Sequence, residues 1–423
     1  MERLRNILLA MAALLFAGLS AGCVYDNYNE DYIPSDVELV TLRIDVGTLG
    51  TRAGIASDAK EQMHTLRVVL LNAAGQIEYN NHYTPGTLED ASYVRADEAK
   101  LFFRTQYGPK KIFLIANEEF TAGVSGGFAS LTAALDSKKV GDDGFEEFVN
   151  GLTFTPDFEK GLVLTSAYEF TVSGADAHDD TKPEAIKKEF FLVHVATKFE
   201  LRFVNDREHP VTIDALSISS LAGDNAAGDM YLMANFGQTS NLAKTGPDGR
   251  FWIDWLADVS KDTTAKPELP DNEGVNSDYD WITDYNLPAA VQHKELNVKS
   301  LLGDLVSDWT IPTGGESQKI TLPIFYASES KYNVGADNFQ NYTFSITLTD
   351  TDPERVNDAL RTHEFTPETY PDLCRFANLH TLFRNTHVIL TVRVSGAPED
   401  MELHLLIGIC PWYEQTIDIP TFD

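Results

Sequence analysis

The sequence predicts an all-β protein with a few short helices, and two patterns carry this prediction. Aliphatic residues alternate with polar ones in segments such as 39–46 and 388–394, which is the period of a strand with one buried face. Other segments, such as 66–71 and 112–116, are nearly continuous apolar runs that end at Asn, which is typical of strands buried on both faces. The length of 423 residues corresponds to two or three domains at roughly 100–200 residues each.

The charge of the chain excludes one class of partner. The sequence has 64 Asp and Glu against 33 Lys and Arg, a net charge of −31, so it repels phosphate backbones and anionic lipid headgroups. We therefore predict no nucleic-acid partner. The 3 Cys are too few for a disulfide framework or a four-Cys metal site, and we predict neither a metal nor a cofactor.

The first element is an export signal over residues 1–22. It starts with Arg3 and Arg5 and continues with an apolar run over 7–16 that is too short to span a bilayer. It ends in Leu-Ser-Ala-Gly before Cys23, which resembles the bacterial lipoprotein box, although the leucine stands four rather than three residues before the Cys. We predict lipidation of Cys23, with plain secretion as the alternative. Each buried CH2 of the acyl chains would add ~0.8 kcal/mol of membrane binding.

A tether, a strand and a loop follow. Residues 24–34 are rich in Asn, Asp and Tyr and lack apolar periodicity, as tethers do. Residues 39–46 form the alternating strand. Residues 47–54 are a loop of mostly small residues that contains one Arg, Arg52, and an exposed loop of this kind is easily cut.

Strand-like segments dominate from residue 64 to the end, and three short helices interrupt them. The candidates are 131–135, 145–149 and 353–363. The last is the strongest, because Asp352 can cap it and Pro353 suits the first helical position.

The polar stretch 174–188 has the composition of a linker. It predicts a boundary between an N-terminal domain over 53–181 and a C-terminal domain over 182–423. The longest polar insertion, 258–284, is predicted to be a surface excursion.

No motif in the sequence indicates catalysis, and we predict that the protein is not an enzyme. The nucleophile elbow, the zincin helix, the dinucleotide fingerprint and the phosphate loop are absent. Only a scattered Asp/Glu pair would escape this test. The acidic segment 271–280 fails the calcium-loop pattern, and His194, between two valines, is predicted to be structural. Cys374 and Cys410 are either a disulfide or two small buried residues, and we favour the second.

The order of the segments carries a resemblance. The signal with Cys23 is followed by the tether, the strand over 39–46, Thr51-Arg52-Ala53 and the run over 66–72 with Gly75. Later come the segment 192–201 and, near the end, Arg384-Asn385-Thr386-His387, the strand 390–394 and Cys410-Pro411-Trp412. This order resembles the FimA-type (type V) fimbrillins of Bacteroidales over nearly the whole chain.

The resemblance implies two transthyretin-like β-sandwich domains in tandem and transport to the outer membrane as a lipoprotein. It implies cleavage by a trypsin-like protease between Arg52 and Ala53, which would release residues 23–52 and leave a hydrophobic groove in the first domain. A C-terminal strand of another fimbrial subunit, of the same or a related kind, would fill the groove. The donor region here would be 401–422, with the side chains of Leu403, Leu405, Ile407 and Ile409.

The residues themselves are compatible with this mechanism and with a simpler one. An alternating strand can restore the hydrogen bonds and buried side chains of an open sheet edge, and four aliphatic side chains contribute ~1.5–3 kcal/mol each. Head-to-tail exchange that does not close produces a filament. The simpler interpretation is that both segments are ordinary strands of their own domains and that Arg52 has no role.

We therefore predict a structural subunit of a surface fimbrium that supports adhesion. A shaft subunit is favoured because the loop with Arg52 is present, and a tip adhesin, marked by the insertion 258–284, or an anchor subunit is the close variant. The alternative from another class is an uncleaved glycan-binding surface lipoprotein, which would need exposed aromatic rings. Its candidates are Trp252, Trp255, Trp281 and Trp309. An enzyme with a buried acidic pair comes third.

Overall fold

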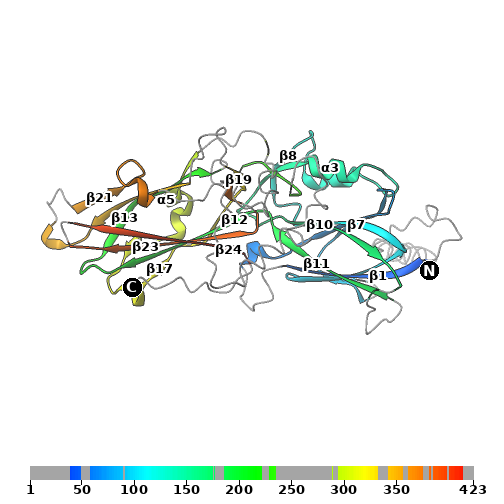
Figure 1. Cartoon of the computed structure of the whole chain (residues 1–423), viewed down its shortest axis with the longest axis horizontal. Helices are drawn as coiled ribbons and strands as arrows, with labels where there is room; N and C mark the ends of the chain where they lie inside the picture. The colour runs from blue at the N-terminus through cyan, green and yellow to red at the C-terminus, as the bar shows by residue number, and fades with distance from the viewer. Residues whose placement is uncertain are drawn as a thin grey trace, which may run out of the picture.

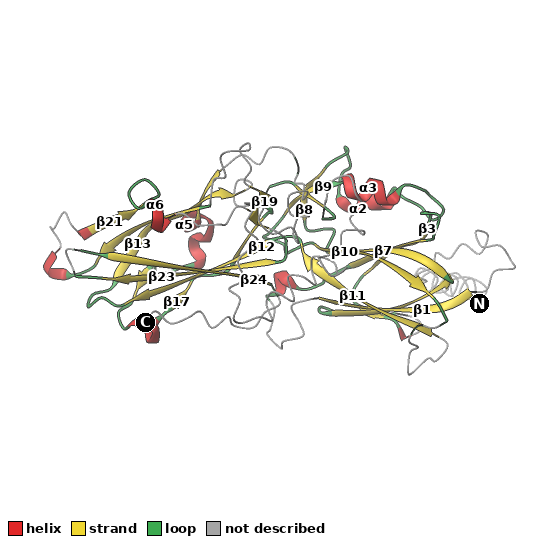
Figure 2. Cartoon of the chain, viewed as in Figure 1, coloured by secondary structure: helices red, strands yellow, loops and turns green. Residues whose placement is uncertain are grey.

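The structure is a computed structural model that describes residues 39–48, 58–88, 91–174, 176, 185–221, 228–234, 288, 294–331, 342–355, 361–374, 381–382, 384–397 and 400–412. Two groups of β-sheets lie end to end along the long axis (Figure 1). Strands dominate both groups and the helices are short (Figure 2), which confirms the predicted all-β class. The part of the chain that is described contains no helix long and apolar enough to cross a membrane.

The first group is a nine-stranded sheet with the order β3-β2-β7-β10-β11-β1-β6-β5-β4. β10 and β11 pair at only two positions, Leu164 with His194 and Thr165 with Val193. The strands β3-β2-β7-β10 and the strands β11-β1-β6-β5-β4 share one hydrophobic core. These two halves of the sheet therefore face each other as a sandwich. The strands are β1 (Leu39–Thr48), β2 (Leu66–Leu71), β3 (Ile77–Tyr83), β4 (Gly86–Thr87), β5 (Tyr93–Val94), β6 (Glu98–Gln106), β7 (Gly108–Ala116), β10 (Leu164–Val172) and β11 (Ala185–His194).

The continuous apolar runs of β2 and β7 are buried on both faces, as predicted. Val68 and Leu114 point into the sandwich core, whereas Val69 and Phe113 belong to a second core. Helices α2 (Leu131–Asp136) and α3 (Phe145–Gly151) cover this second core (Figure 2). A small sheet of β8 (Thr121–Val124), β9 (Thr153–Pro156) and β14 (Met230–Tyr231) lies beside it.

Asn side chains end both apolar runs. After β2, Oδ1 of Asn72 accepts hydrogen bonds from the backbone N–H groups of Ala74 and Gln76, and Gly75 adopts φ +83°, which favours glycine. After β7, Oδ1 of Asn117 accepts a hydrogen bond from the backbone N–H of His64 at 2.6 Å. Each Asn therefore supplies the acceptor that the turning backbone lacks.

Two of the three predicted helices are confirmed, as α2 and α3, and the third is wrong at its end. Oδ1 of Asp352 caps the backbone N–H of Glu354 at 2.9 Å, but η8 is a 3-10 helix over Pro353–Arg355. Residues 356–360 lie outside the described part, and a strand, β21 (Thr362–Phe365), then pairs with β20. Cross-strand pairing outweighs the local helical preference of this segment.

The second group is a sandwich of two sheets with the orders β17-β12-β23-β24 and β15-β13-β20-β21. β18 also pairs with β12, and β16 with β13. One core lies between the two sheets. The strands are β12 (Thr197–Asn205), β13 (Val211–Leu221), β15 (Lys294–Asn297), β16 (Thr310–Ile311), β17 (Ile320–Thr321), β18 (Phe325–Ala327), β20 (Thr343–Asp350), β23 (Thr386–Ser395) and β24 (Glu402–Pro411). Beside them lie β19 (Ser330–Lys331) with β22 (Thr381–Leu382), α5 (Val298–Leu302), α6 (Pro371–Cys374) and the 3-10 helices η6 (Gly303–Leu305) and η7 (Gly315–Gln318).

The chain passes from the first group of sheets to the second after residue 182, where the sequence predicts the domain boundary. The predicted linker 174–188 overlaps β11, where Ala185 and Ile186 are buried and pair with Thr41 and Leu42 of β1. The domain boundary at 182 would place β11 in the second domain, but β11 hydrogen-bonds within the first sheet. Only Val195 and Ala196 separate β11 from β12.

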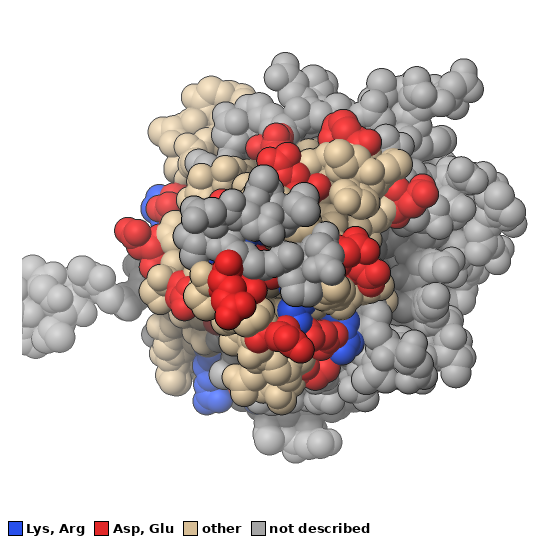
Figure 3. Space-filling model, turned by 90° about the vertical axis from the view of Figure 1, so that its left-hand side faces the viewer, with Lys and Arg blue, Asp and Glu red and all other residues tan. Residues whose placement is uncertain are grey.

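Acidic side chains are spread over the free end of the second group. Figure 3 views this end, and basic residues occur on it in only a few places. The electrostatics of this surface disfavour a polyanionic partner.

Candidate functional site

β1 is a central strand. It pairs in parallel with β11 at eight positions and antiparallel with β6 at nine. Its burial alternates along its length, and Leu42 and Ile44 have no exposed surface. The predicted strand over 39–46 is confirmed and extends to Thr48.

Removal of β1 would open the middle of the first sheet. The backbone edges of β6 and β11 would lose their partners, and unpaired edges of this kind are templates for another strand. Side chains that pack in the same core as β1 would lose cover, among them Leu101, Phe103, Ile186, Phe190 and Leu192. The result would be an apolar groove with a hydrogen-bonding edge on each side.

The outer face of β1 is polar. Arg43 pairs with Asp45 at 2.6 Å, and Asp45 lies 3.6 Å from Lys187 of β11. The side-chain hydrogen bond to Glu189 raises the pKa of Lys187, so the lysine stays charged. A hollow of about 350 Å³ adjoins this face. Partly exposed pairs contribute little to stability, so the buried aliphatic face is what holds β1 in place.

β24, which contains the predicted donor residues, is an edge strand. Within the described part of the chain, its ten residues pair with β23 alone, from Glu402 with Ser395 to Pro411 with Thr386. Leu403 is buried, Leu405 and Ile407 are half-buried against the core of the second group, and His404, between Leu403 and Leu405, is exposed. Ile409 pairs with Val388 through the backbone. Burial alternates over 401–404 and is intermediate at each of the residues 405–407.

A buried ion pair joins the two groups close to the start of β23. The guanidinium of Arg384 donates to both carboxylate oxygens of Glu329, at 3.0 and 2.7 Å, and neither side chain is more than 1% exposed. Arg384 also donates to the carbonyl oxygens of Tyr231 and Leu232 and to Oγ1 of Thr165 in β10. The motif that begins at Arg384 therefore ties both groups together.

His387, three residues later, forms a polar contact inside the second group. Its Nε2 lies 3.2 Å from Oε2 of Glu200 in β12. The hydrogen bond from His387, together with Arg202, lowers the pKa of Glu200 to about 2 although burial opposes the shift. Burial lowers the pKa of His387.

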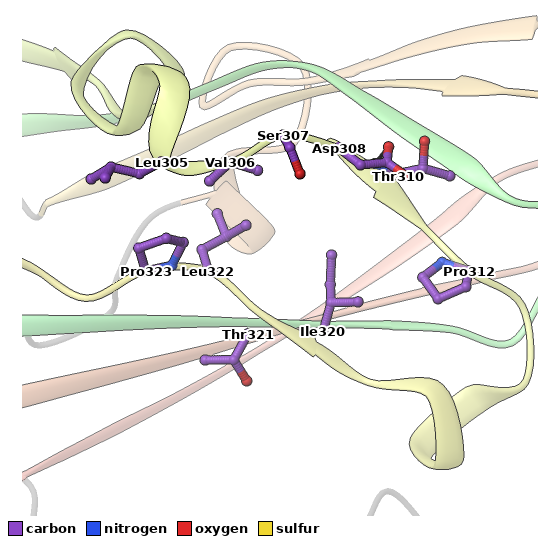
Figure 4. A pocket seen from close by; sticks show the side chains of 10 residues that line it. All are labelled: Leu305, Val306, Ser307, Asp308, Thr310, Pro312, Ile320, Thr321, Leu322 and Pro323. Atoms are coloured by element: carbon purple, nitrogen blue, oxygen red, sulfur yellow. Dashed lines mark hydrogen bonds between the residues drawn. The ribbon is translucent and has the colours of Figure 1, made fainter.

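A surface groove of about 490 Å³ lies between the β16 and β17 segments. Figure 4 shows Leu305 and Val306 on one wall and Ile320 and Leu322 on the other. Leu305 is 71% exposed. Because β17 and β24 are the two edges of one sheet, the groove and the candidate donor strand lie on opposite sides of it.

Several residues singled out by the sequence lie outside the described part. These are Cys23, Arg52, Ala53, Trp252, Trp255, Trp281 and the acidic segment 258–284. Among the described residues, Trp309 packs partly buried against the core of the second group, and no group of His, Cys, Asp or Glu has the arrangement of a metal site. Cys374 is a free, buried thiol whose pKa burial raises to about 11.

His194 has the structural role that the sequence predicts. It is buried at the end of β11, with ring nitrogens 3.2 Å from Oδ1 of Asn385 and 3.2 Å from the backbone oxygen of Glu61. Sequence reasoning missed Glu61 and Glu329 as buried partners. Only the Arg384-Asn385 pair, ahead of an apolar strand, marked this region in the sequence.

Comparison with known proteins gives matches among solved structures. No family model and no curated protein match the chain. Among solved structures, it is similar to the tip fimbrial protein of Porphyromonas gingivalis with a C-terminal truncation, at 12% identity, 89% coverage of this chain, 100% of that chain and TM-score 0.44. It is also similar to the fimbrilin of Porphyromonas gingivalis W83 (14%, 88% and 98%, TM-score 0.41) and to a fimbrial assembly protein of Parabacteroides distasonis (11%, 88% and 99%, TM-score 0.39).

Proposed function

We propose that the chain is a structural subunit of a surface fimbrium that polymerises by strand exchange. In this proposal, cleavage after Arg52 removes β1, and the C-terminal strand of another copy takes its place. The observation that carries the proposal is the contrast between the two strands. β1 is central and has a hydrogen-bonded neighbour on each side, whereas β24 is an edge strand with one neighbour.

If β24 of another copy replaces β1, β24 gains backbone pairing and its side chains become more buried. Both gains favour assembly. In its own sheet β24 pairs at ten positions, while the place of β1 offers eight positions on β11 and nine on β6. Leu405 and Ile407 are half-buried in their own sheet, whereas Leu42 and Ile44 of β1 are fully buried. At ~1.5–3 kcal/mol per fully buried aliphatic side chain, the deeper burial adds to the gain in pairing.

The two surfaces are different, and this decides the form of the assembly. The acceptor groove lies in the first group and the donor strand in the second, at separate parts of an elongated molecule (Figure 1). Such a head-to-tail contact produces a filament when it repeats without closing into a ring. Lipid on Cys23 would hold the uncut subunit at the outer membrane until cleavage frees it.

Limited digestion with trypsin tests this proposal. We expect selective cutting before Ala53, followed by filaments detected by light scattering, because loss of β1 opens the groove. An Arg52→Ala variant is expected to stay monomeric under the same conditions.

Cutting at Ala53 without growth in size would contradict polymerisation. Tip, anchor and glycan-binding functions would then take its place.

A further inference from the structure

Directly after β24, the side chain of Trp412 packs between the two groups. The side chain of Trp412 is 5% exposed and packs in a small core with Leu162, Ala196 and Tyr326. Its backbone N–H donates to the carbonyl oxygen of Asn385 at 2.9 Å. The end of β24 is therefore held by the junction as well as by β23.

Four side chains from both groups surround the indole of Trp412, and we call them the indole site: Glu61, His194, Lys198 and Tyr326. The indole N–H donates to Oε2 of Glu61 at 3.2 Å. The ring is stacked between His194, with centroids 4.3 Å apart and planes 14° apart, and Tyr326, at 5.6 Å and 2°. Nζ of Lys198 lies 5.3 Å from the indole centroid.

The charge states of Glu61 and His194 suit the hydrogen bond and the ring stacking that they form with Trp412. Oε1 of Glu61 accepts hydrogen bonds from Nζ of Lys198 at 2.7 Å and from the hydroxyl of Tyr326 at 3.0 Å. Burial alone would raise the pKa of Glu61, but Lys198 and the other partners outweigh burial and lower it, so the carboxylate stays charged. Burial lowers the pKa of His194, which keeps the stacked ring neutral. The indole N–H thus meets a fixed anionic acceptor, which is the stronger kind of hydrogen bond.

The indole site is built on elements that adjoin β1. Glu61 ends η2 (Ala59–Glu61), in the first described segment after the proposed cleavage point. His194 ends β11, and Leu192, two residues earlier, pairs with Thr48 at the end of β1. Loss of the residues before 53 would therefore place a new chain end shortly before η2 and would remove one of the two neighbours of β11.

We propose that the indole site binds Trp412 to keep β24 on its own chain, and that removal of β1 weakens this binding and frees β24 for donation. The inference rests on the proposed function and adds the residues that control when the donor becomes available. Without such a contact, β24 would be an edge strand held by one neighbour before any groove exists to receive it.

Amide hydrogen exchange of β24 in the full-length, uncut chain tests the role of the indole site. Trp412→Ala is expected to speed exchange of the 405–410 amides ten- to hundredfold, because a charge-assisted hydrogen bond and two ring contacts are lost. Trp412→Phe keeps the stacking and should give a smaller increase. Tyr107→Ala, at an exposed aromatic residue of the first group outside the indole site, is the matched control and should leave these amides unchanged.

The same measurement after trypsin cutting tests the link to β1. In the wild-type chain, kept below the concentration at which filaments form, exchange over 405–410 should rise after cutting while the amides of β2 and β7 stay protected. Unchanged exchange in both Trp412 variants overturns the binding role, and exchange in the wild type that cutting leaves slow overturns the link to β1. If cutting frees β24 and the copies stay monomeric, the indole site stands and the proposed polymerisation fails. If Trp412→Ala does not fold, Trp412→Phe and Glu61→Gln decide the same question.

Discussion

Replacement of Arg384 by alanine is expected to lower the free energy of unfolding by about 3–5 kcal/mol, because it removes the guanidinium that balances the buried charge of Glu329. The carboxylate of Glu329 is completely buried and accepts two hydrogen bonds from the guanidinium. The carbonyl oxygens of Tyr231 and Leu232 would lose their donor as well. Urea denaturation followed by circular dichroism measures the effect.

The control is Arg95→Ala. Arg95 and Glu98 form an ion pair at 3.0 Å, but both side chains are largely exposed, at 64% and 46%. Surface pairs of this kind contribute about 0–1 kcal/mol. Adding Glu329→Leu to Arg384→Ala should recover part of the loss, because it removes the stranded charge. Equal effects of Arg384→Ala and Arg95→Ala would contradict the structural role of the buried pair.

Replacement of Leu405 by aspartate is expected to weaken assembly of the cut subunit about a thousandfold. In the place of β1, the side chain would enter the fully buried row of Leu42 and Ile44, and an unpaired buried carboxylate costs several kcal/mol, at about 1.4 kcal/mol for each factor of ten. The cost to the chain's own fold is smaller, since Leu405 already reaches solvent there. The concentration at which light scattering detects filaments measures the change.

His404→Asp is the matched control for Leu405→Asp. It adds the same charge one residue earlier on the opposite face of β24, and His404 is exposed in the chain's own sheet. A strand in the place of β1 would present this position on the outer face beside Arg43 and Asp45, so assembly should stay close to that of the wild type. Equal loss of assembly in both variants would indicate that net charge, and not the buried face of β24, controls polymerisation.

The periodic segments of the sequence predict their structure well, because burial on one face or on both faces leaves a direct pattern. β1 alternates as its sequence indicates, and β2 is apolar throughout because the core and the helices cover its two faces. The segment 353–363 was predicted less well, since its last residues pair with β20, and no local pattern encodes that contact. The same reason explains the linker 174–188, whose end becomes a strand by pairing with β1.

In the candidate site, too, the local patterns are predictable from the sequence and the distant contacts are not. The alternation of β1 and β24 is visible in the sequence, but their positions at the centre and the edge of their sheets are not, because strand order depends on contacts between distant segments. Glu61 meets Trp412 across 351 positions of the chain. Nothing near either residue indicates the other, so the sequence could not predict the indole site.

Binding of a donor peptide to the cut subunit tests the central claim most directly. The probe is a fluorescent peptide of residues 401–422, measured by anisotropy against the trypsin-cut Leu405→Asp chain, whose groove its own copies cannot fill. Saturable binding is expected to the cut chain and none to the uncut Arg52→Ala chain, because only the first has lost β1. Equal binding to both chains, or no binding to either, would contradict the claim that the place of β1 accepts the C-terminal strand.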